Sequence, residues 1–161
     1  TPSDILAFVN NQLCENNEAE MFVTVWMGIL DLSTGVMTAA NAGHEYPAFR
    51  KADGEFELIK DKHGFVLAGL EDVAYTDYEI RFEPGDTLYV YTDGVAEATN
   101  AESKLFGTER MLQALNGSPD KACRKILENV SGGIHAFVQE APQFDDITMV
   151  ALTYYGETGE H

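Results

Sequence analysis

Short stretches with the spacing of β-strands dominate the first half of this chain. They are rich in β-branched and aromatic residues, and they span residues 21–30, 36–41, 46–51, 55–59, 74–82 and 87–91. The intervening segments Asp31–Gly35 and Ala52–Gly54 end in glycine, which supplies the positive φ that hairpin turns require. Strands this short, joined by turns this tight, predict an antiparallel meander.

Segments with helical periodicity lie on both sides of the predicted strands. Ser3 can cap a first helix that has one apolar face and ends near Glu15–Asn17. Thr108 precedes a second helix, for which Gly117 is a C-terminal stop. A third helix opening at Ser118–Pro119 and an apolar strand over 148–155 complete the pattern. This order predicts an α+β fold in which helices flank antiparallel sheets.

Composition and charge exclude several classes of protein. The 161 residues are 45% apolar and 11% aromatic, enough for one globular domain with its own core. The net charge of −17 repels nucleic acid and anionic lipid, and no apolar run is long enough to span a membrane, so we expect contact with neither. Cys14 and Cys123 lie too far apart for a C-x-x-C motif, which argues against a disulfide framework or zinc site and predicts a cytoplasmic location.

Acidic residues occur where two apolar strands end. Asp93 and Gly94 directly follow the strand predicted over 87–91, and Asp145 and Asp146 precede the last apolar strand. Adjacent carboxylates repel each other unless a cation or hydrogen-bond donors compensate. Mg²⁺ and Mn²⁺ prefer oxygen ligands from a few carboxylates together with water. Asp-Gly is also common in plain turns and Asp-Asp can simply cap a strand, so each motif alone leaves the structural explanation open.

Six short strings extend the argument from single motifs to most of the chain. In order, they are MFVT at 21–24, NAGH at 41–44, PGD at 84–86, YTDGVAEA at 91–98, FG at 106–107 and DDIT at 145–148. Together they resemble the bacterial SpoIIE-type serine phosphatases, relatives of the type 2C metal-dependent protein phosphatases that include regulators of sigma-factor partner switching. The resemblance runs from the first helix to the last strand.

The resemblance implies a centre of two Mn²⁺ or two Mg²⁺ ions that activates a water for in-line attack on phosphorus, without a phospho-enzyme intermediate. By motif, Asp93 and Asp145 are expected to be metal ligands. Gly94 is expected near the site, and Asp146 is expected to support the ligand geometry. The implied substrate is phosphoserine or phosphothreonine on a signalling protein, such as an anti-sigma-factor antagonist.

The family pattern also includes strings that this sequence lacks. A Gly-Asp-x-x-x-Asp-like strand and a Gly-Asp-x-x-Gly-x-Gly segment are expected upstream of the first helix, and neither is present. Residues 1–161 are therefore predicted to be the C-terminal portion of a phosphatase domain, an N-terminally truncated β-sandwich. We expect such a chain to be inactive or weakly active alone and to form a homodimer through uncovered strand edges.

Two other functions compete with the phosphatase. One is a non-catalytic module that binds a partner or regulates it with an incomplete metal site. The other is a domain holding a single structural Ca²⁺ or Mg²⁺, but calcium loops usually gather their oxygens within one short segment, unlike the separated acids here. The separated acids therefore favour the phosphatase over the structural-cation domain, and the non-catalytic module stays open.

Histidines and one further acid complete the candidate residues. His44 titrates near neutrality and is a candidate proton donor to the leaving serine oxygen, with a structural hydrogen bond as its other role. Glu97 either supports the metal or is a carboxylate in the first turn of a helix. His63, His135 and His161 are predicted to be surface residues, and His63 and His161 have no acidic partner at ligand spacing.

Overall fold

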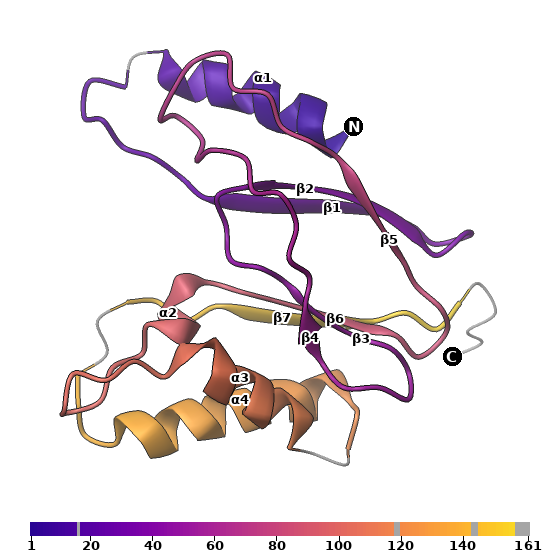
Figure 1. Ribbon diagram of the computed structural model, residues 1–161, viewed down its shortest axis with the longest axis vertical. Coiled ribbons are helices and arrows are strands. Elements are labelled where there is room, and N and C mark those ends of the chain that lie inside the picture. Colours follow the sequence, from indigo (N-terminus) through magenta and orange to yellow (C-terminus); the bar gives the residue numbers. More distant parts are fainter. Residues whose placement is uncertain (16, 118–119, 143–144, 157–161) are drawn as a thin grey trace. The chain divides into compact units, whose positions relative to one another are not determined.

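A computed structural model describes residues 1–15, 17–117, 120–142 and 145–156, which form two compact units. Unit 1 contains Thr1–Tyr46, Lys60–Glu83 and the residues from Tyr155. Unit 2 contains Pro47–Ile59 and Pro84–Tyr154. Each unit has its own antiparallel sheet and its own helical layer, which confirms the α+β class (Figure 1).

Unit 1 is a three-stranded sheet with one helix. Its elements are α1 (Pro2–Cys14), β1 (Val25–Asp31), β2 (Val36–Ala42) and β5 (Tyr78–Arg81), with strand order β1-β2-β5. Helix α1 runs along one face of this sheet (Figure 1). Leu6 of α1, 2% exposed, packs with Ala40 and Ala42 of β2 and with Leu67, so small residues on the strand let the helix approach closely.

The start of α1 differs from the sequence prediction. Thr1, not Ser3, is the N-cap: its hydroxyl accepts from the Asp4 backbone N–H, and the Asp4 carboxylate accepts from the Thr1 nitrogen. Pro2 suits the first helical position because its missing N–H would have no partner there, so the helix begins earlier than Ser3. Ser3 instead donates from its backbone N–H and its hydroxyl to the Asp77 carboxylate, at 2.8 and 2.9 Å.

The Asp77 contact predicts a pH-dependent contribution to stability. Burial raises the Asp77 pKa, but hydrogen bonds from Thr1 and Ser3 outweigh it and hold that pKa below its ordinary value. A carboxyl with a lowered native pKa stabilises the fold above its unfolded pKa, and this contribution disappears as pH falls through the native pKa. We expect Asp77→Asn to lower the free energy of unfolding by about 1 kcal/mol at neutral pH. Urea unfolding should show the difference shrinking below about pH 4; a difference that persists there would contradict the assignment.

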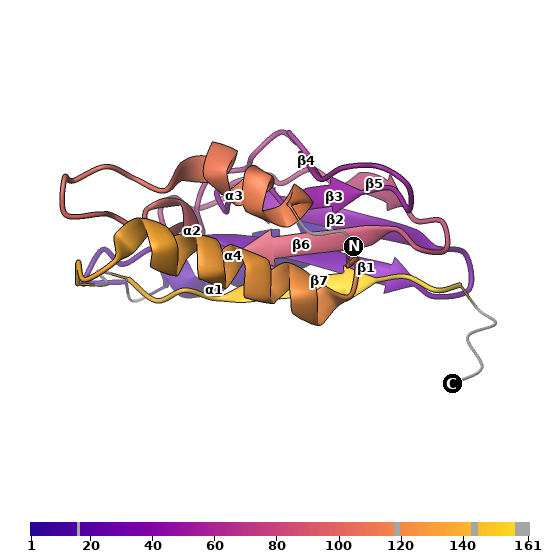
Figure 2. The same cartoon turned by 90° about the horizontal axis from the view of Figure 1, so that it is seen from below.

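Unit 2 is a four-stranded sheet with three helices. Its strands are β3 (Ala48–Arg50), β4 (Glu57–Leu58), β6 (Thr87–Tyr91) and β7 (Met149–Thr153), in the order β4-β3-β6-β7. Its helices are α2 (Asp93–Ala96), α3 (Gly107–Asn116) and α4 (Cys123–Val138). Helices α3 and α4 lie against one face of this sheet (Figure 2). The core between them includes Tyr89, Met111, Ile126 and Val130, all fully buried.

The hairpin pairings predicted at Asp31–Gly35 and Ala52–Gly54 are confirmed, but the continuous antiparallel meander is wrong. Strand β2 pairs with β1 and β5, whereas the next strand in sequence, β3, pairs with β4 and β6 in the other sheet. Both passages of the chain from unit 1 into unit 2 occur at a proline, Pro47 and Pro84. Strands β2 and β5 end before these prolines, and proline, which cannot donate a ladder hydrogen bond, does not resume their pairing.

Element boundaries were predicted best where residues such as glycine, proline or aspartate mark the end of a strand or helix. β6 covers the predicted residues, and α3 ends before Gly117 as expected. α3 begins at Gly107 rather than after Thr108, and β1 begins only at Val25. The predicted cap Ser118–Pro119 lies outside the described residues, and α4 begins after Ala122. No helix in the described ranges is long and apolar enough to cross a membrane.

Candidate active site

The two acidic motifs meet at one edge of the sheet of unit 2. Strands β6 and β7 are antiparallel neighbours, with Tyr91 opposite Met149. The end of β6 therefore lies beside the start of β7, although many residues separate them in sequence. Asp93 follows β6, and Asp145 and Asp146 precede β7. The pairing brings together the acids that the sequence singled out.

Thr92 holds the two acidic segments in register. Its backbone N–H donates to the Thr148 carbonyl at 3.0 Å, and its hydroxyl accepts from the Thr148 backbone N–H at 3.0 Å. The same hydroxyl donates to the Asp146 carbonyl at 3.1 Å. Sequence reasoning missed this function of Thr92 and Thr148, although both residues belong to the strings that support the family resemblance.

Gly94 is required by close packing rather than by a sharp turn. The chain continues from β6 into the short helix α2, and Gly94 has no positive φ. A Cβ at this position would lie 2.5 Å from the Asp146 carbonyl oxygen and 3.1 Å from its carbonyl carbon. Those atoms are backbone and cannot swing aside, so only glycine permits this approach of the two segments.

The two predicted ligands have similar local geometry. An Asp93 carboxylate oxygen accepts from the Gly94 backbone N–H at 2.9 Å, and an Asp145 carboxylate oxygen accepts from the Asp146 backbone N–H at 2.7 Å. Asp93, Asp145 and Asp146 are all solvent-exposed. These hydrogen bonds orient the carboxylates without burying them.

The donor set fits Mg²⁺ or Mn²⁺ better than a metal that needs a full protein cage. Within the described residues, no three His, Cys, Asp or Glu side chains gather as a metal-binding group. Mg²⁺ dehydrates reluctantly and is commonly bound through one or two carboxylates plus water and substrate phosphate. Asp93 and Asp145, as exposed oxygen donors at one sheet edge, suit that mode of binding.

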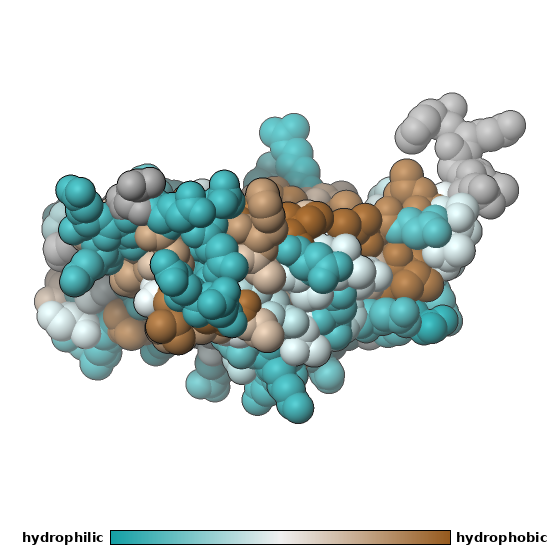
Figure 3. All heavy atoms as spheres, turned by 90° about the horizontal axis from the view of Figure 1, so that it is seen from above, coloured by the Kyte–Doolittle hydropathy of each residue, from teal (hydrophilic) through white to brown (hydrophobic). Residues whose placement is uncertain are grey.

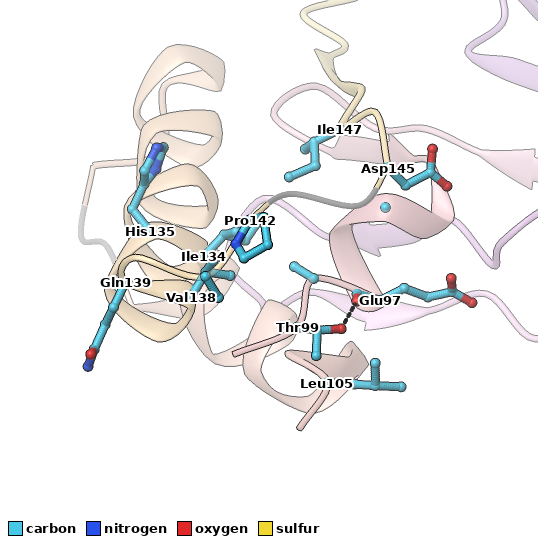
Figure 4. Close-up of a pocket in the computed structure, with 13 residues that line it drawn as sticks. Glu97, Thr99, Leu105, Ile134, His135, Val138, Gln139, Pro142, Asp145 and Ile147 are labelled. Atoms are coloured by element: carbon cyan, nitrogen blue, oxygen red, sulfur yellow. Dashed lines mark hydrogen bonds between the residues drawn. The ribbon is translucent and has the colours of Figure 1, made fainter. Parts of the chain in front are cut away.

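A pocket of about 390 Å³ opens next to these acids. Gly94, Glu97 and Asp145 contribute to its wall, and most of its other lining residues, such as Ile134 and Val138 of α4, are apolar. In Figure 4 the carboxylates of Glu97 and Asp145 extend to the same side, away from α4. Glu97 is the C-cap of α2, so the prediction that it lies in the first turn of a helix is wrong. The helix begins at Asp93, and its first-turn carboxylate is that of Asp93.

His44 belongs to unit 1, whereas the acids belong to unit 2. Its Nδ1 lies 3.1 Å from the Thr24 hydroxyl, and its backbone N–H donates to the Asn41 side-chain oxygen at 2.8 Å. The Asn41 amide donates in turn to the Asp61 carboxylate, whose side chain is only 2% exposed. The fold thus fixes the backbone of His44 firmly, and the catalytic role of His44 stays a prediction.

The remaining histidines have structural surroundings. His63 is exposed, but its Nε2 lies 3.4 Å from an Asp61 carboxylate oxygen, so the expectation that it has no acidic partner is wrong. His135 is exposed as predicted, with Nδ1 2.8 Å from the Ser131 carbonyl oxygen. His161 lies outside the described residues.

Comparison with known families identifies the chain. The family model described as "Stage II sporulation protein E (SpoIIE)" matches residues 1–155. The chain belongs to the SpoIIE family. Two curated relatives of this SpoIIE-family chain are Protein IcfG from Synechocystis sp., 30% identical over 138 residues, and Phosphoserine phosphatase RsbU from Bacillus subtilis, 26% identical over 153 residues. The matches cover 86% and 94% of this chain but 22% and 44% of those relatives.

Solved structures confirm a fold like that of type 2C phosphatases. The SiaA-PP2C domain of Pseudomonas aeruginosa superimposes with a TM-score of 0.77 at 21% identity, covering 95% of this chain and 61% of that domain. The phosphatase domain of SpoIIE from Bacillus subtilis gives a TM-score of 0.69 at 14% identity, covering 100% of this chain and 70% of that one. The fold is thus shared with these domains at 14–21% sequence identity.

Proposed function

We propose that this chain functions as a Mn²⁺- or Mg²⁺-dependent protein phosphatase acting on phosphoserine or phosphothreonine. The observation that supports this function is the edge of unit 2 where Thr92, next to Asp93, is hydrogen-bonded to Asp146 and Thr148 of the segment that carries Asp145. A cation bound there would supply positive charge to the phosphoryl oxygens and lower the pKa of a water. Family membership and the name of RsbU as a phosphoserine phosphatase agree with the proposal.

Three acidic residues would have different roles in such a site. Asp93 and Asp145 would hold the cation through their exposed oxygens. Asp146 supports them through its backbone, because its N–H donates to Asp145 and its carbonyl accepts from Thr92. Structures of relatives described as a magnesium complex of RsbX and as an Mn-presoaked SpoIIE phosphatase domain support the choice of metal.

The substrate class follows from the same family. We propose that the substrate is a phosphorylated signalling protein of the anti-sigma-factor-antagonist type and that both proteins are cytoplasmic. The two free cysteines, Cys14 and Cys123, are consistent with a reducing compartment.

The function is tested by hydrolysis and by metal binding on the same sample. Phosphate release from a phosphoserine peptide is measured with MnCl₂, with MgCl₂ and with EDTA, and calorimetry follows Mn²⁺ binding directly. We expect release that requires the cation and that is weak for residues 1–161 alone. Binding of Mn²⁺ without any release above the EDTA control would overturn the phosphatase proposal.

A non-catalytic regulatory module is the second candidate function. The observation in its favour is that the described residues hold no metal-binding group of three side chains. For this function, calorimetry should show no Mn²⁺ binding, and Asp93→Asn should leave every binding property of the chain unchanged. Metal-dependent turnover excludes it.

The proposed role of His44 predicts a dependence on the leaving group. If His44 donates a proton to the departing serine oxygen, His44→Ala should slow hydrolysis of a phosphoserine peptide by about 100-fold. p-Nitrophenyl phosphate should be affected far less, because nitrophenolate leaves without protonation. Thr24→Val, which removes the hydroxyl beside Nδ1, tests whether positioning alone matters. Equal losses on both substrates would assign His44 a structural role.

Self-association of the chain is proposed from its surface. The side of the molecule that bears α1 shows apolar side chains among hydrophilic ones (Figure 3). On α1 itself, Ile5 is 40% exposed and Phe8, one turn further along, is 68% exposed. We expect a homodimer that Phe8→Lys weakens at least tenfold, measured as the dissociation constant by light scattering over a concentration series. A chain that is monomeric at all concentrations would refute this.

A further inference from the structure

The pocket beside Asp145 is unlike the rest of the site in chemistry. Its described lining includes two carboxylates at the rim, Glu97 and Asp145, and no Lys or Arg. Deeper in, the walls are aliphatic, with Leu105 on one side and Ile134 and Val138 of α4 on the other (Figure 4). The catalytic chemistry proposed above needs only the acids and leaves these apolar walls without a function.

The size of the pocket suits a side chain of a bound partner. Its volume of about 390 Å³ lies within the range of roughly 300 to 1,000 Å³ that is usual for ligand sites. Leu105 contributes to the wall and is 54% exposed, so part of its side chain is accessible to a bound partner. An apolar anchor surrounded by a polar rim is the common form of a protein-recognition pocket.

The position of the pocket indicates which side chain enters it. Gly94 and Asp145 belong both to the wall of the pocket and to the acidic edge where the phosphoryl group is proposed to bind. One residue of extended chain spans about 3.3–3.6 Å, so a residue next to a phosphoserine held at that edge can reach the pocket. The acidic rim, on a chain of net charge −17, favours a substrate segment with basic flanking residues.

We propose that this pocket is a specificity site that accepts an aliphatic side chain near the phosphoserine of the protein substrate, within a basic segment. The inference rests on the proposed phosphatase function and adds a selection rule to it. Contact with an aliphatic side chain would remove Leu105 and its neighbours from water and would hold the phosphoserine in place for hydrolysis.

A peptide set tests this rule. Phosphoserine peptides with an alanine and lysine scaffold carry one leucine at each of three positions on either side of the phosphoserine, and the reference peptide has none. We expect the peptide with leucine at one of these positions to have a kcat/KM about tenfold or more above that of the reference peptide. Ala141→Leu, which reduces the pocket volume, should bring the ratio of these two kcat/KM values close to 1. The control Ala136→Leu changes an exposed position of α4 outside the pocket lining and should leave the ratio unchanged.

A binding measurement separates failure of this inference from failure of the phosphatase function. Methyl NMR signals of Leu105, Ile134 and Val138 are followed while the best leucine peptide is added in EDTA, where no turnover occurs. Shifts of these signals support the pocket even if no peptide is hydrolysed. Turnover without leucine preference, or shifts confined to other methyl groups, would overturn it.

Discussion

We expect Asp93→Asn and Asp145→Asn each to lower turnover of a phosphoserine peptide by roughly 100-fold or more. Each substitution removes one negative charge where a cation would be held. The amide oxygen of asparagine can still accept the backbone hydrogen bond that orients each side chain, from Gly94 in one case and from Asp146 in the other. The fold should therefore persist, and the loss should appear in activity and in metal affinity alone.

The measurement is steady-state hydrolysis at several Mn²⁺ concentrations, with circular dichroism to confirm folding. Asp53→Asn is the matched control, because Asp53 is a fully exposed acid in a turn of the same unit. It should keep full activity. Asp146→Asn should lose little activity, because Asp146 supports the site through its backbone N–H and carbonyl, which the substitution keeps. Asp93→Asn with near-normal turnover would show that the acidic edge is not the reaction centre.

Gly94→Ala is the second substitution for which we expect a large effect. The new Cβ would meet the Asp146 carbonyl at 2.5 Å, so the segments that bear Asp93 and Asp145 must separate. Such overpacking costs about 1–3 kcal/mol of unfolding free energy. Because the displaced atoms belong to the site, turnover should also fall by more than tenfold.

Gly132→Ala provides the matched control for Gly94→Ala. Gly132 is an exposed residue of α4, and a Cβ there meets nothing within 4 Å. We expect a gain of about 0.5–1 kcal/mol, because alanine favours the helix more than glycine does. Urea unfolding and peptide hydrolysis on both variants make the test. A Gly94→Ala protein as stable and active as its parent would show that the two segments have room to relax.

The sequence located the strand that leads to Asp93 better than it predicted which strands pair. Thr87–Tyr91 was located correctly because a buried strand there is bounded by Pro84–Asp86 and by Asp93–Gly94, all strong local signals. Which strands pair is a property of contacts distant in sequence, and turn residues between neighbours do not determine it. For this reason the predicted meander was wrong. The pairing of β6 with β7 places the two acidic motifs at the same edge of the sheet.

Short-range sequence signals also failed to predict contacts between residues that are distant in sequence. Gly94 is an ordinary turn residue in sequence, and only the approach of the Asp146 carbonyl shows why no other residue fits. Thr92 and Thr148 are typical strand residues, and their mutual hydrogen bonds depend on the register of β6 and β7. The pocket combines α2, α4 and the segment before β7, so no single stretch of sequence could have revealed it.

The pairing of β6 with β7 has a consequence for synthesis on the ribosome. β6 and α2 emerge well before β7, since the whole of α3 and α4 lies between them. Until β7 has been synthesised, one edge of β6 has no partner in this sheet. The chain between β6 and β7 forms a long loop, and closing it is slow because its conformational entropy must be lost before the contacts form. Asp145 reaches Asp93 only at this last step. The proposed site is therefore not assembled before nearly all of unit 2 has been translated.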